Sequence, residues 1–344
     1  IIKDDSMKKN AFVTFIIRND SYLPGALVFA YALKLQKTQN DLICIVSDNI
    51  SEYAINTLKL IYDDVLVIDE VYVPHERRHE RQDRPFLFSR FNAFRLGPDG
   101  DLGKKYEKII IADCDLLPLY EYDTLFDLHA PAGIINEKKE YCMEYDEMGK
   151  YIVPESVFLN SEWIWHKVYA DVPHGTMIPK EITDRIKTDK ENMGVNASIY
   201  LFNPSMKLYN SVMDDLENQE VINEISLYNW PEMQYITDKL SGQWTNVDLR
   251  FSSFNGYPDI AHIKGIHFAG LKPWSMKNKS VKSFGKFDDY KLWYYTFIKM
   301  CNEVDHVIDN RKIKKLYNQI SLMLQDEKYL FYKKYIPHLS HFFE

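Results

Sequence analysis

Short apolar segments alternate with helix-like segments along the first part of the chain. Three segments have the composition of buried strands: residues 11–17 (AFVTFII), 42–46 (LICIV) and 65–71. Two segments between them have helical spacing: residues 26–35, and residues 51–61 with Ser51 as the capping residue. Strands that are apolar on both faces and joined by helices form parallel sheets, because a parallel connection requires a crossover. The pattern predicts an α/β fold with a mixed, mostly parallel central sheet.

The alternation returns after an irregular stretch at residues 136–190, which is rich in aromatic and charged side chains. One further strand is expected before that stretch, at residues 108–112 (KIIIA), and two after it, at 195–202 (VNASIYLF) and 263–268. Further helices are expected at residues 208–216, 232–240, 288–302 and 311–324. We therefore expect one α/β domain over residues 8–284, with the irregular stretch as an insertion over its ligand-binding face. A helical appendage over residues 285–344 would pack on this domain.

The charge and the cysteines narrow the class of protein. A net charge of -8 and a pI near 5.7 provide no basic field, so nucleic acid is not expected as a partner. The chain has no signal sequence and no apolar run near the ~20 residues needed to span a bilayer, which predicts a cytoplasmic protein. Cys44 and Cys114 lie in strand-like runs and are expected to be buried free thiols, without disulfides.

Two carboxylates, Asp113 and Asp115, follow the most apolar predicted strand and flank Cys114. In an extended chain their i, i+2 spacing places both side chains on one side. Ligands of open α/β sheets bind beyond the carboxyl ends of the strands, where two oxygen ligands suit a divalent cation that bridges phosphates. An isolated D-x-D is more often a solvated turn, but its position after a buried strand favours a metal site.

A second cluster, H-F-A-G-L-K-P-W at residues 267–274, follows another predicted strand. His267 can complete a metal site, and an imidazole beside two carboxylates favours Mn²⁺ over Mg²⁺. Gly270 permits close approach of the backbone, and Lys272 can neutralise diphosphate oxygens. Separately, these residues would be interpreted as a packed histidine and a surface lysine. Their proximity favours a shared site.

Together these motifs resemble those of the glycogenin-like glycosyltransferase family 8. The family's opening T-x-x-x-N-D-x-Y is similar to residues 14–22, with one extra residue, and its N-[SA]-[GS] strand is similar to residues 196–198. The resemblance covers residues 11–275 apart from the insertion. It implies a GT-A (Rossmann-like) nucleotide-diphospho-sugar transferase fold and retaining transfer of a hexose, most readily glucose, from a UDP-sugar to an acceptor hydroxyl. A homodimer is implied by the resemblance alone.

The resemblance also implies roles for individual residues. Asn19 and Tyr22, with the backbone of Phe15 and Ile17, would hold the uracil and ribose. Arg90 stands where the family has a lysine that faces the sugar and phosphate, and it keeps the charge but changes the donor geometry. The remaining donor-binding residues would be Asp113, Cys114, Asp115, Asn196, Ala197, Gln234, His267, Gly270 and Lys272.

The family's Asp-Gln pair is altered in this chain. Gln234 matches the glutamine, whereas the aspartate is either replaced by Met233 or displaced to Glu232. The expected catalytic residues are Asp115, Lys272, Gln234 and Glu232. Because no nucleophile stands out, a same-face displacement assisted by the departing phosphate is favoured over a covalent route through Glu232.

Three other functions fit parts of the pattern. A self-glycosylating primer protein is the first, although Asn255 stands where glycogenin has its modified tyrosine, with Tyr257 nearby. The second is a catalytically silent UDP-sugar-binding protein, and the weakest is a nucleotidyltransferase. The acceptor is not identified by the sequence. Aromatic and histidine side chains of the insertion could contact a saccharide or a peptide or could simply pack: Tyr151, Trp163, Trp165, His166 and His174.

Overall fold

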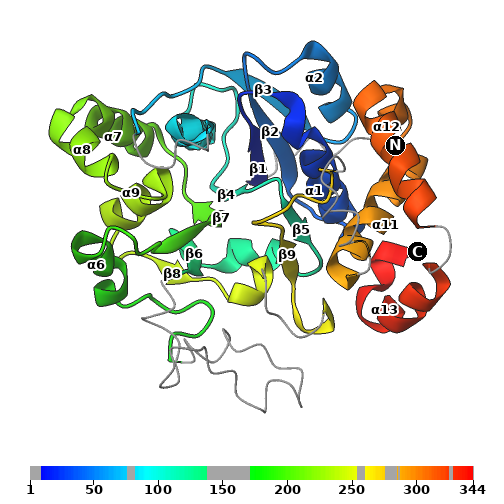
Figure 1. Ribbon diagram of the computed structural model, residues 1–344. Helices are drawn as coiled ribbons and strands as arrows, with labels where there is room; N and C mark the ends of the chain where they lie inside the picture. The colour runs from blue at the N-terminus through cyan, green and yellow to red at the C-terminus, as the bar shows by residue number, and fades with distance from the viewer. Residues whose placement is uncertain are drawn as a thin grey trace.

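A seven-stranded mixed sheet forms the centre of the protein (Figure 1), in the order β3-β2-β1-β4-β7-β6-β8. The computed structural model describes residues 9–75, 82–137, 171–253, 260–275, 285, 287–324 and 328–343. The strands of this sheet are β1 (Asn10–Ile16), β2 (Asp41–Ser47), β3 (Asp64–Ile68), β4 (Lys108–Ala112), β6 (Ala132–Ile135), β7 (Val195–Phe202) and β8 (Thr245–Asn246).

Strands β1 to β4 are parallel to one another, and β7 is antiparallel to both β4 and β6. The predicted mixed, mostly parallel sheet is therefore confirmed. Strand β7 has the expected bounds, whereas β3 ends at Ile68 rather than at residue 71. Because β1 to β4 are parallel, their carboxyl ends lie along the same edge of the sheet.

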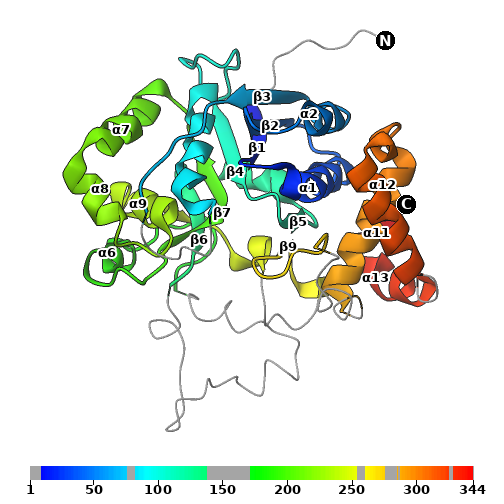
Figure 2. The same cartoon turned by 45° about the horizontal axis from the view of Figure 1, so that its top comes forward.

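Both faces of the sheet are buried. Phe12 and Ile16 of β1 belong to one apolar cluster, and Ala11 and Val13 belong to the other. The first face is covered by α1 (Leu23–Leu35), α2 (Glu52–Leu58) and the C-terminal helices. The second is covered by η2 (Arg84–Leu96), α6 (Lys180–Thr188), α7 (Met206–Glu217), α8 (Gln219–Ile225) and α9 (Pro231–Lys239). Figure 2 shows the two groups of helices on opposite sides of the sheet.

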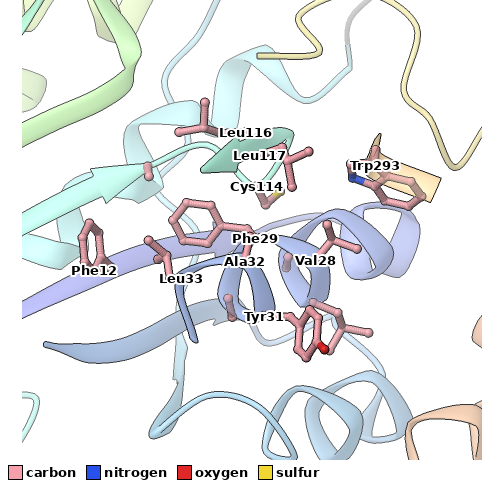
Figure 3. Packing of buried hydrophobic residues seen from close by; sticks show 14 of the residues in the cluster. Phe12, Val28, Phe29, Tyr31, Ala32, Leu33, Cys114, Leu116, Leu117 and Trp293 are labelled. Atoms are coloured by element: carbon pink, nitrogen blue, oxygen red, sulfur yellow. The ribbon is translucent and has the colours of Figure 1, made fainter. Parts of the chain in front are cut away.

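The C-terminal part consists of α11 (Asp288–Glu303), α12 (Arg311–Met323) and α13 (Lys328–Phe343). The first two match predicted helices, and α11 packs against α1. Side chains of α1, of the strand β5 (Leu116–Pro118) and of Trp293 in α11 share one apolar cluster (Figure 3). The division into an α/β domain and a helical appendage stays a prediction. Within the described part of the chain, no helix is long and apolar enough to cross a membrane.

Some elements were not predicted. Helix α6 lies within the range read as an irregular insertion, of which residues 138–170 lie outside the described part. The 13-residue 3₁₀ helix η2 and helix α8 were also not expected. The remaining short elements are η1 (Asp20–Tyr22), η3 (Tyr122–Asp127), η4 (Leu249–Ser252), η5 (Ile260–His262) and η6 (Val307–Asp309). Cys44, Cys114 and Cys301 are buried free thiols, and Cys142 lies outside the described residues.

A second, two-stranded sheet pairs β5 with β9 (Gly265–His267) in antiparallel register. Strand β5 begins immediately after Asp115, and its first residue, Leu116, pairs with His267. The backbone N–H of Phe268 donates to the carbonyl of Asp115 at 3.0 Å. This ladder brings two sequence motifs that are 150 residues apart to the same place.

Gly25 lets helix α1 approach the loop that follows β9. A Cβ at this position would lie 2.5 Å from the carbonyl oxygen of Cys114 and 2.5 Å from the Trp274 ring. We expect Gly25→Ala to lower the free energy of unfolding by about 1–3 kcal/mol, because the backbone carbonyl cannot move aside as a side chain can. Urea denaturation measures this change. Gly270→Ala is the matched control, since a Cβ there meets no atom within 4 Å, and an equal loss in both variants would contradict the steric explanation.

Candidate functional site

Asp113, Asp115 and His267 converge at the carboxyl end of β4. One ligand atom from each of the three lies within 4.8 Å of the others. His267 Nε2 is 3.3 Å from Asp115 Oδ1 and 3.8 Å from Asp113 Oδ2. Strand β4 positions the two aspartates, and the β5–β9 register positions the histidine opposite them.

The three side chains fit a divalent cation. Within the described part of the chain, Asp115 Oδ1 is buried without a hydrogen bond, and His267 Nε2 lies 3.3 Å from it. A buried carboxylate oxygen needs either a donor or a cation. Two carboxylates and one imidazole form a set of ligands that suits Mn²⁺ well. Mg²⁺ can bind to the same set, but the imidazole suits it less. Asp113, Asp115 and His267 would hold such an ion.

Lys272 and Arg90 each contact one of the two carboxylates. Lys272 Nζ donates to Asp115 and also to the carbonyl of Phe268, the latter at 2.7 Å. Burial alone would raise the pKa of Asp115, but His267 and Lys272 lower it below its ordinary value. Burial raises the pKa of Asp113, against the opposing effect of Arg90. Asp115 therefore has the lower pKa of the two and keeps its negative charge to lower pH than Asp113.

Arg90 is buried between two acidic groups. Its Nη2 lies 2.9 Å from Asp113 Oδ1 and 3.8 Å from Glu232 Oε1, and its Nη1 donates to the carbonyl of Ala197 at 2.9 Å. The guanidinium carbon lies over the Phe15 ring, 4.5 Å from its centroid. Only 3% of the Arg90 side chain is exposed, so its charge lies in the interior of the site.

Helix α9 places Glu232 and Gln234 in different surroundings. Glu232 is buried beside Arg90, and within the described residues its Oε2 has no hydrogen bond. Gln234 is fully buried, accepts from the N–H of Trp230 at 2.8 Å, and donates to the carbonyls of Lys190 and Asn192 at 2.7 and 2.8 Å. Met233 packs in the apolar cluster on that face of the sheet. Glu232 therefore lies beside Arg90 in the acidic cluster, whereas Gln234 forms hydrogen bonds with backbone groups.

The proposed catalytic role of Gln234 stays a prediction. Its three hydrogen bonds use both amide hydrogens and one lone pair of the oxygen, so contact with a sugar would require it to break backbone bonds or to use the second lone pair. These bonds tie α9 to the segment that precedes β7. Glu232 differs from Gln234, because its second carboxylate oxygen is buried and has no hydrogen bond within the described part.

The segment after β1 carries the residues expected to hold a base and ribose. Asn19 Oδ1 accepts from the N–H of Ser21 at 2.9 Å and caps η1, while the N–H of Asn19 donates to the carbonyl of Ile17 at 2.8 Å. The Tyr22 ring packs edge-on against Trp274, with centroids 5.6 Å apart. Lys272 Nζ lies 5.9 Å from the centroid of the Tyr22 ring. Tyr22 and Lys272 therefore lie close together, and their roles in donor binding stay predictions.

Arg18 directly precedes Asn19 in this segment. It has a left-handed φ of 69°, and its backbone N–H donates to Glu70 at 2.8 Å. Its guanidinium pairs with Glu70 at 2.8 Å and lies 4.0 Å from the centroid of the Phe86 ring. Sequence reasoning missed Glu70 and Phe86, and the one-residue insertion was the only signal that could have indicated them.

The other expected donor-binding residues lie near this edge of the sheet. Asn196 Oδ1 accepts from the N–H of Ser198 at 2.8 Å, and the carbonyl of Ser198 accepts from the N–H of Asp113 at 3.1 Å. Ala197 contributes its carbonyl to Arg90. Space is open around the α-carbon of Gly270. The Cys114 side chain is buried in the apolar cluster, which leaves only its backbone for a ligand.

Several residues considered for acceptor binding are not described. Tyr151, Trp163, Trp165 and His166 lie outside the described residues, as do Asn255 and Tyr257. His174 is described: its Nδ1 accepts from the N–H of Asp248 at 3.0 Å, and its ring stacks on Phe251. The observed contacts of His174 are therefore with Asp248 and Phe251 of this chain, as expected for a packed side chain.

Comparison with known proteins relates the chain to glycosyltransferases. An uncharacterised protein of Acanthamoeba polyphaga mimivirus is 24% identical over 326 residues, which cover 90% of this chain and 100% of that protein. Human glycogenin-1 is 28% identical over 300 residues, which cover 80% of this chain and 67% of that protein. Glycogenin of Komagataella phaffii is 23% identical over 83% of this chain and 64% of that protein. No protein-family model matches the chain.

A solved structure shares the fold. The galactosyltransferase LgtC, in complex with donor and acceptor sugar analogues, superposes with a TM-score of 0.53 at 12% sequence identity, covering 86% of this chain and 96% of that one. The GT-A fold predicted from the sequence is confirmed by this likeness together with the mixed sheet. The chain is a distant relative of the glycogenins. It spans about two thirds of the length of human glycogenin-1 and of the Komagataella phaffii glycogenin.

Proposed function

We propose that this protein is a metal-dependent, retaining glycosyltransferase that moves a hexose from a UDP-sugar to an acceptor hydroxyl. The observation that carries the proposal is the convergence of Asp113, Asp115 and His267, with Lys272 on Asp115, at the ligand-binding edge of a GT-A sheet. The distant similarity to glycogenins and the fold of LgtC support the same reading.

The residues of the site divide into three tasks. Asn19 and Tyr22, with the backbone of Phe15 and Ile17, bind the nucleoside, Tyr22 through its ring face. Asp113, Asp115 and His267 would hold Mn²⁺, which would supply Lewis acidity to the diphosphate. Lys272 exchanges its contact with Asp115 for a diphosphate oxygen, and so stabilises the charge that develops on departing UDP.

Arg90 and Glu232 line the side of the site where the sugar would lie. Arg90 Nη2 lies 2.9 Å from Asp113 Oδ1 and 3.8 Å from Glu232 Oε1, so it contacts both carboxylates. Ion pairing with a guanidinium lowers the nucleophilicity of a carboxylate, which favours same-face displacement over a covalent intermediate on Glu232. Glu232 then serves to bind sugar hydroxyls through its unpartnered oxygen. A glycosyl adduct on Glu232, found by mass spectrometry, would reverse this assignment.

A self-glycosylating primer is the second candidate, because the similarity to glycogenins extends over most of the chain. In that case the protein would be both enzyme and acceptor. Intact mass after incubation with UDP-glucose would show added hexose units. A homodimer, a cytoplasmic location and glucose as the preferred sugar are expectations from the resemblance, and the acceptor is left open.

Release of UDP tests the proposal directly. With Mn²⁺ present, we expect one sugar of a panel of UDP-glucose, UDP-galactose and UDP-xylose to yield UDP, and we expect EDTA to abolish the release because the diphosphate then lacks its cation. Restoring Mn²⁺ in excess of EDTA is the control and should restore the rate. Binding of UDP–Mn²⁺ without release from any sugar would favour a silent UDP-sugar-binding protein, whereas a failure to bind UDP would refute the proposal.

A further inference from the structure

We propose that Tyr290 of α11 is a positioning residue that holds the Lys272 loop (residues 268–275) in its binding conformation, so that the C-terminal helices form part of the donor site. The ligand named in this inference, UDP–Mn²⁺, rests on the proposed function. The geometry rests on contacts within the ligand-free protein. The expected catalytic residues all lie outside residues 285–344, and no role in the reaction has been assigned to these helices so far.

Tyr290 contacts the Lys272 loop at two points. Its Oη donates to the carbonyl of Leu271 at 2.6 Å, and its ring packs edge-on against Phe268 with centroids 5.2 Å apart. Burial raises the pKa of the Tyr290 hydroxyl to about 12, so the group stays a hydrogen-bond donor over the working pH range. The two contacts lie on either side of Gly270, at Phe268 and at Leu271.

Lys272 closes the same loop from the inside. Its Nζ donates to the carbonyls of Phe268 and Ala269, at 2.7 and 3.3 Å, while it also contacts Asp115. The N–H of Ser275 donates back to the carbonyl of Lys272 at 2.9 Å. If Lys272 moves from Asp115 to a phosphate oxygen, its contacts with the Phe268 and Ala269 carbonyls are no longer secured, whereas the contacts of Tyr290 with Phe268 and Leu271 remain.

The end of the loop is fixed to α11 by aromatic packing. The Trp274 ring lies 5.6 Å from Tyr22 and 5.6 Å from Trp293, and Trp293 stacks on Phe297 at 5.4 Å. Trp293 and Phe297 are fully buried in the cluster shared with α1 and β5 (Figure 3). A rigid helix therefore contacts both the nucleoside-binding ring of Tyr22, through Trp274, and the backbone that carries Lys272.

Tyr290→Phe tests the inference because it removes only the hydroxyl that fixes Leu271. Tyr294→Phe is the matched control: it lies one turn away on the same helix, it is buried, and its hydroxyl has no hydrogen-bond partner within the described residues. In the ligand-free protein, we expect amide hydrogen exchange in the 268–275 segment to accelerate about fivefold in Tyr290→Phe and to stay unchanged in Tyr294→Phe. Calorimetry should show Kd for UDP–Mn²⁺ raised about fivefold in Tyr290→Phe alone.

The outcomes separate this inference from the proposed function. Exchange at residues 268–275 that is the same in Tyr290→Phe and wild type would overturn the positioning role, whatever the affinity for UDP. Faster exchange throughout α11, with a melting temperature lowered by more than about 3 °C, would also overturn it, because the hydroxyl would then act only on global stability. If exchange accelerates locally but the wild type does not bind UDP–Mn²⁺, the proposed function fails while the positioning of the loop stands.

Discussion

Asp115→Asn is expected to lower the rate of UDP release from the donor by about 10³-fold or more. Asp115 is buried, supplies an oxygen to the proposed metal site, and contacts both His267 and Lys272. Asparagine keeps the size of the side chain but removes the charge, which weakens binding of the cation and releases Lys272 from its partner. Stabilisation of leaving-group charge by a metal contributes several kcal/mol, and about 4 kcal/mol corresponds to 10³ in rate.

The measurement is kcat/KM for UDP release with Mn²⁺ titrated over a wide range, together with calorimetric binding of Mn²⁺ alone. Asp305→Asn is the control, because Asp305 is an exposed carboxylate in the segment after α11 and should leave both quantities unchanged. Thermal unfolding without metal establishes that both variants fold. A fall of less than tenfold in Asp115→Asn at saturating Mn²⁺ would argue that the acidic cluster is structural.

The regular part of the fold could be predicted because burial on both faces leaves a strong signal. Strand β7 is buried throughout its length and was predicted with its observed bounds. The 3₁₀ helix η2 was not predicted, since 3₁₀ helices lack the 3.6-residue periodicity by which helices are recognised. Strand β8, of two residues, is likewise too short to leave a pattern, and its pairing with β6 depends on the sheet already being in place.

The site could be predicted in part for similar reasons. The two aspartates and His267 come together through strand ends and one ladder, which motif order could indicate. Whether Met233 or Glu232 takes the place of the family's aspartate could not be decided from the sequence, because one residue along a helix rotates a side chain by about 100° and the start of α9 decides which side chain meets Arg90. The contact of Tyr290 with Leu271 joins segments on different elements, and no local pattern encodes it.

Arg90→Ala is expected to cause the largest loss of stability of any single change in the site. Only 3% of the Arg90 side chain is exposed, and its guanidinium faces Asp113 at 2.9 Å and Glu232 at 3.8 Å. Burial alone would lower the pKa of Arg90, but the two carboxylates raise it, so the group stays charged. Removal of one partner from a buried ion pair typically costs about 3–5 kcal/mol, because the remaining charge is left in a poorly solvated place.

Urea denaturation of wild type and Arg90→Ala at pH 7 measures the loss. Arg95→Ala is the control from the same helix η2, since Arg95 pairs with the half-exposed Asp101 and such a pair contributes less than about 1 kcal/mol. The double variant Arg90→Met with Glu232→Gln should recover part of the loss, because it replaces two of the three charges by neutral groups. Equal losses of unfolding free energy in Arg90→Ala and Arg95→Ala would contradict this explanation, because they would mean that water reaches the charges around Arg90.

The loss in Arg90→Ala is also expected to depend on pH. Burial already raises the pKa of Asp113 in the folded protein, and Arg90 opposes that effect, so removing Arg90 raises this pKa further. A carboxyl group whose pKa is higher in the folded than in the unfolded state binds more protons when folded, and its destabilising effect disappears as the pH falls. The difference in unfolding free energy between Arg90→Ala and wild type should therefore be largest at neutral pH and should narrow toward pH 4. A difference that stays constant between pH 7 and pH 4 would indicate that lost packing on Phe15, rather than an unpaired carboxylate, accounts for the loss.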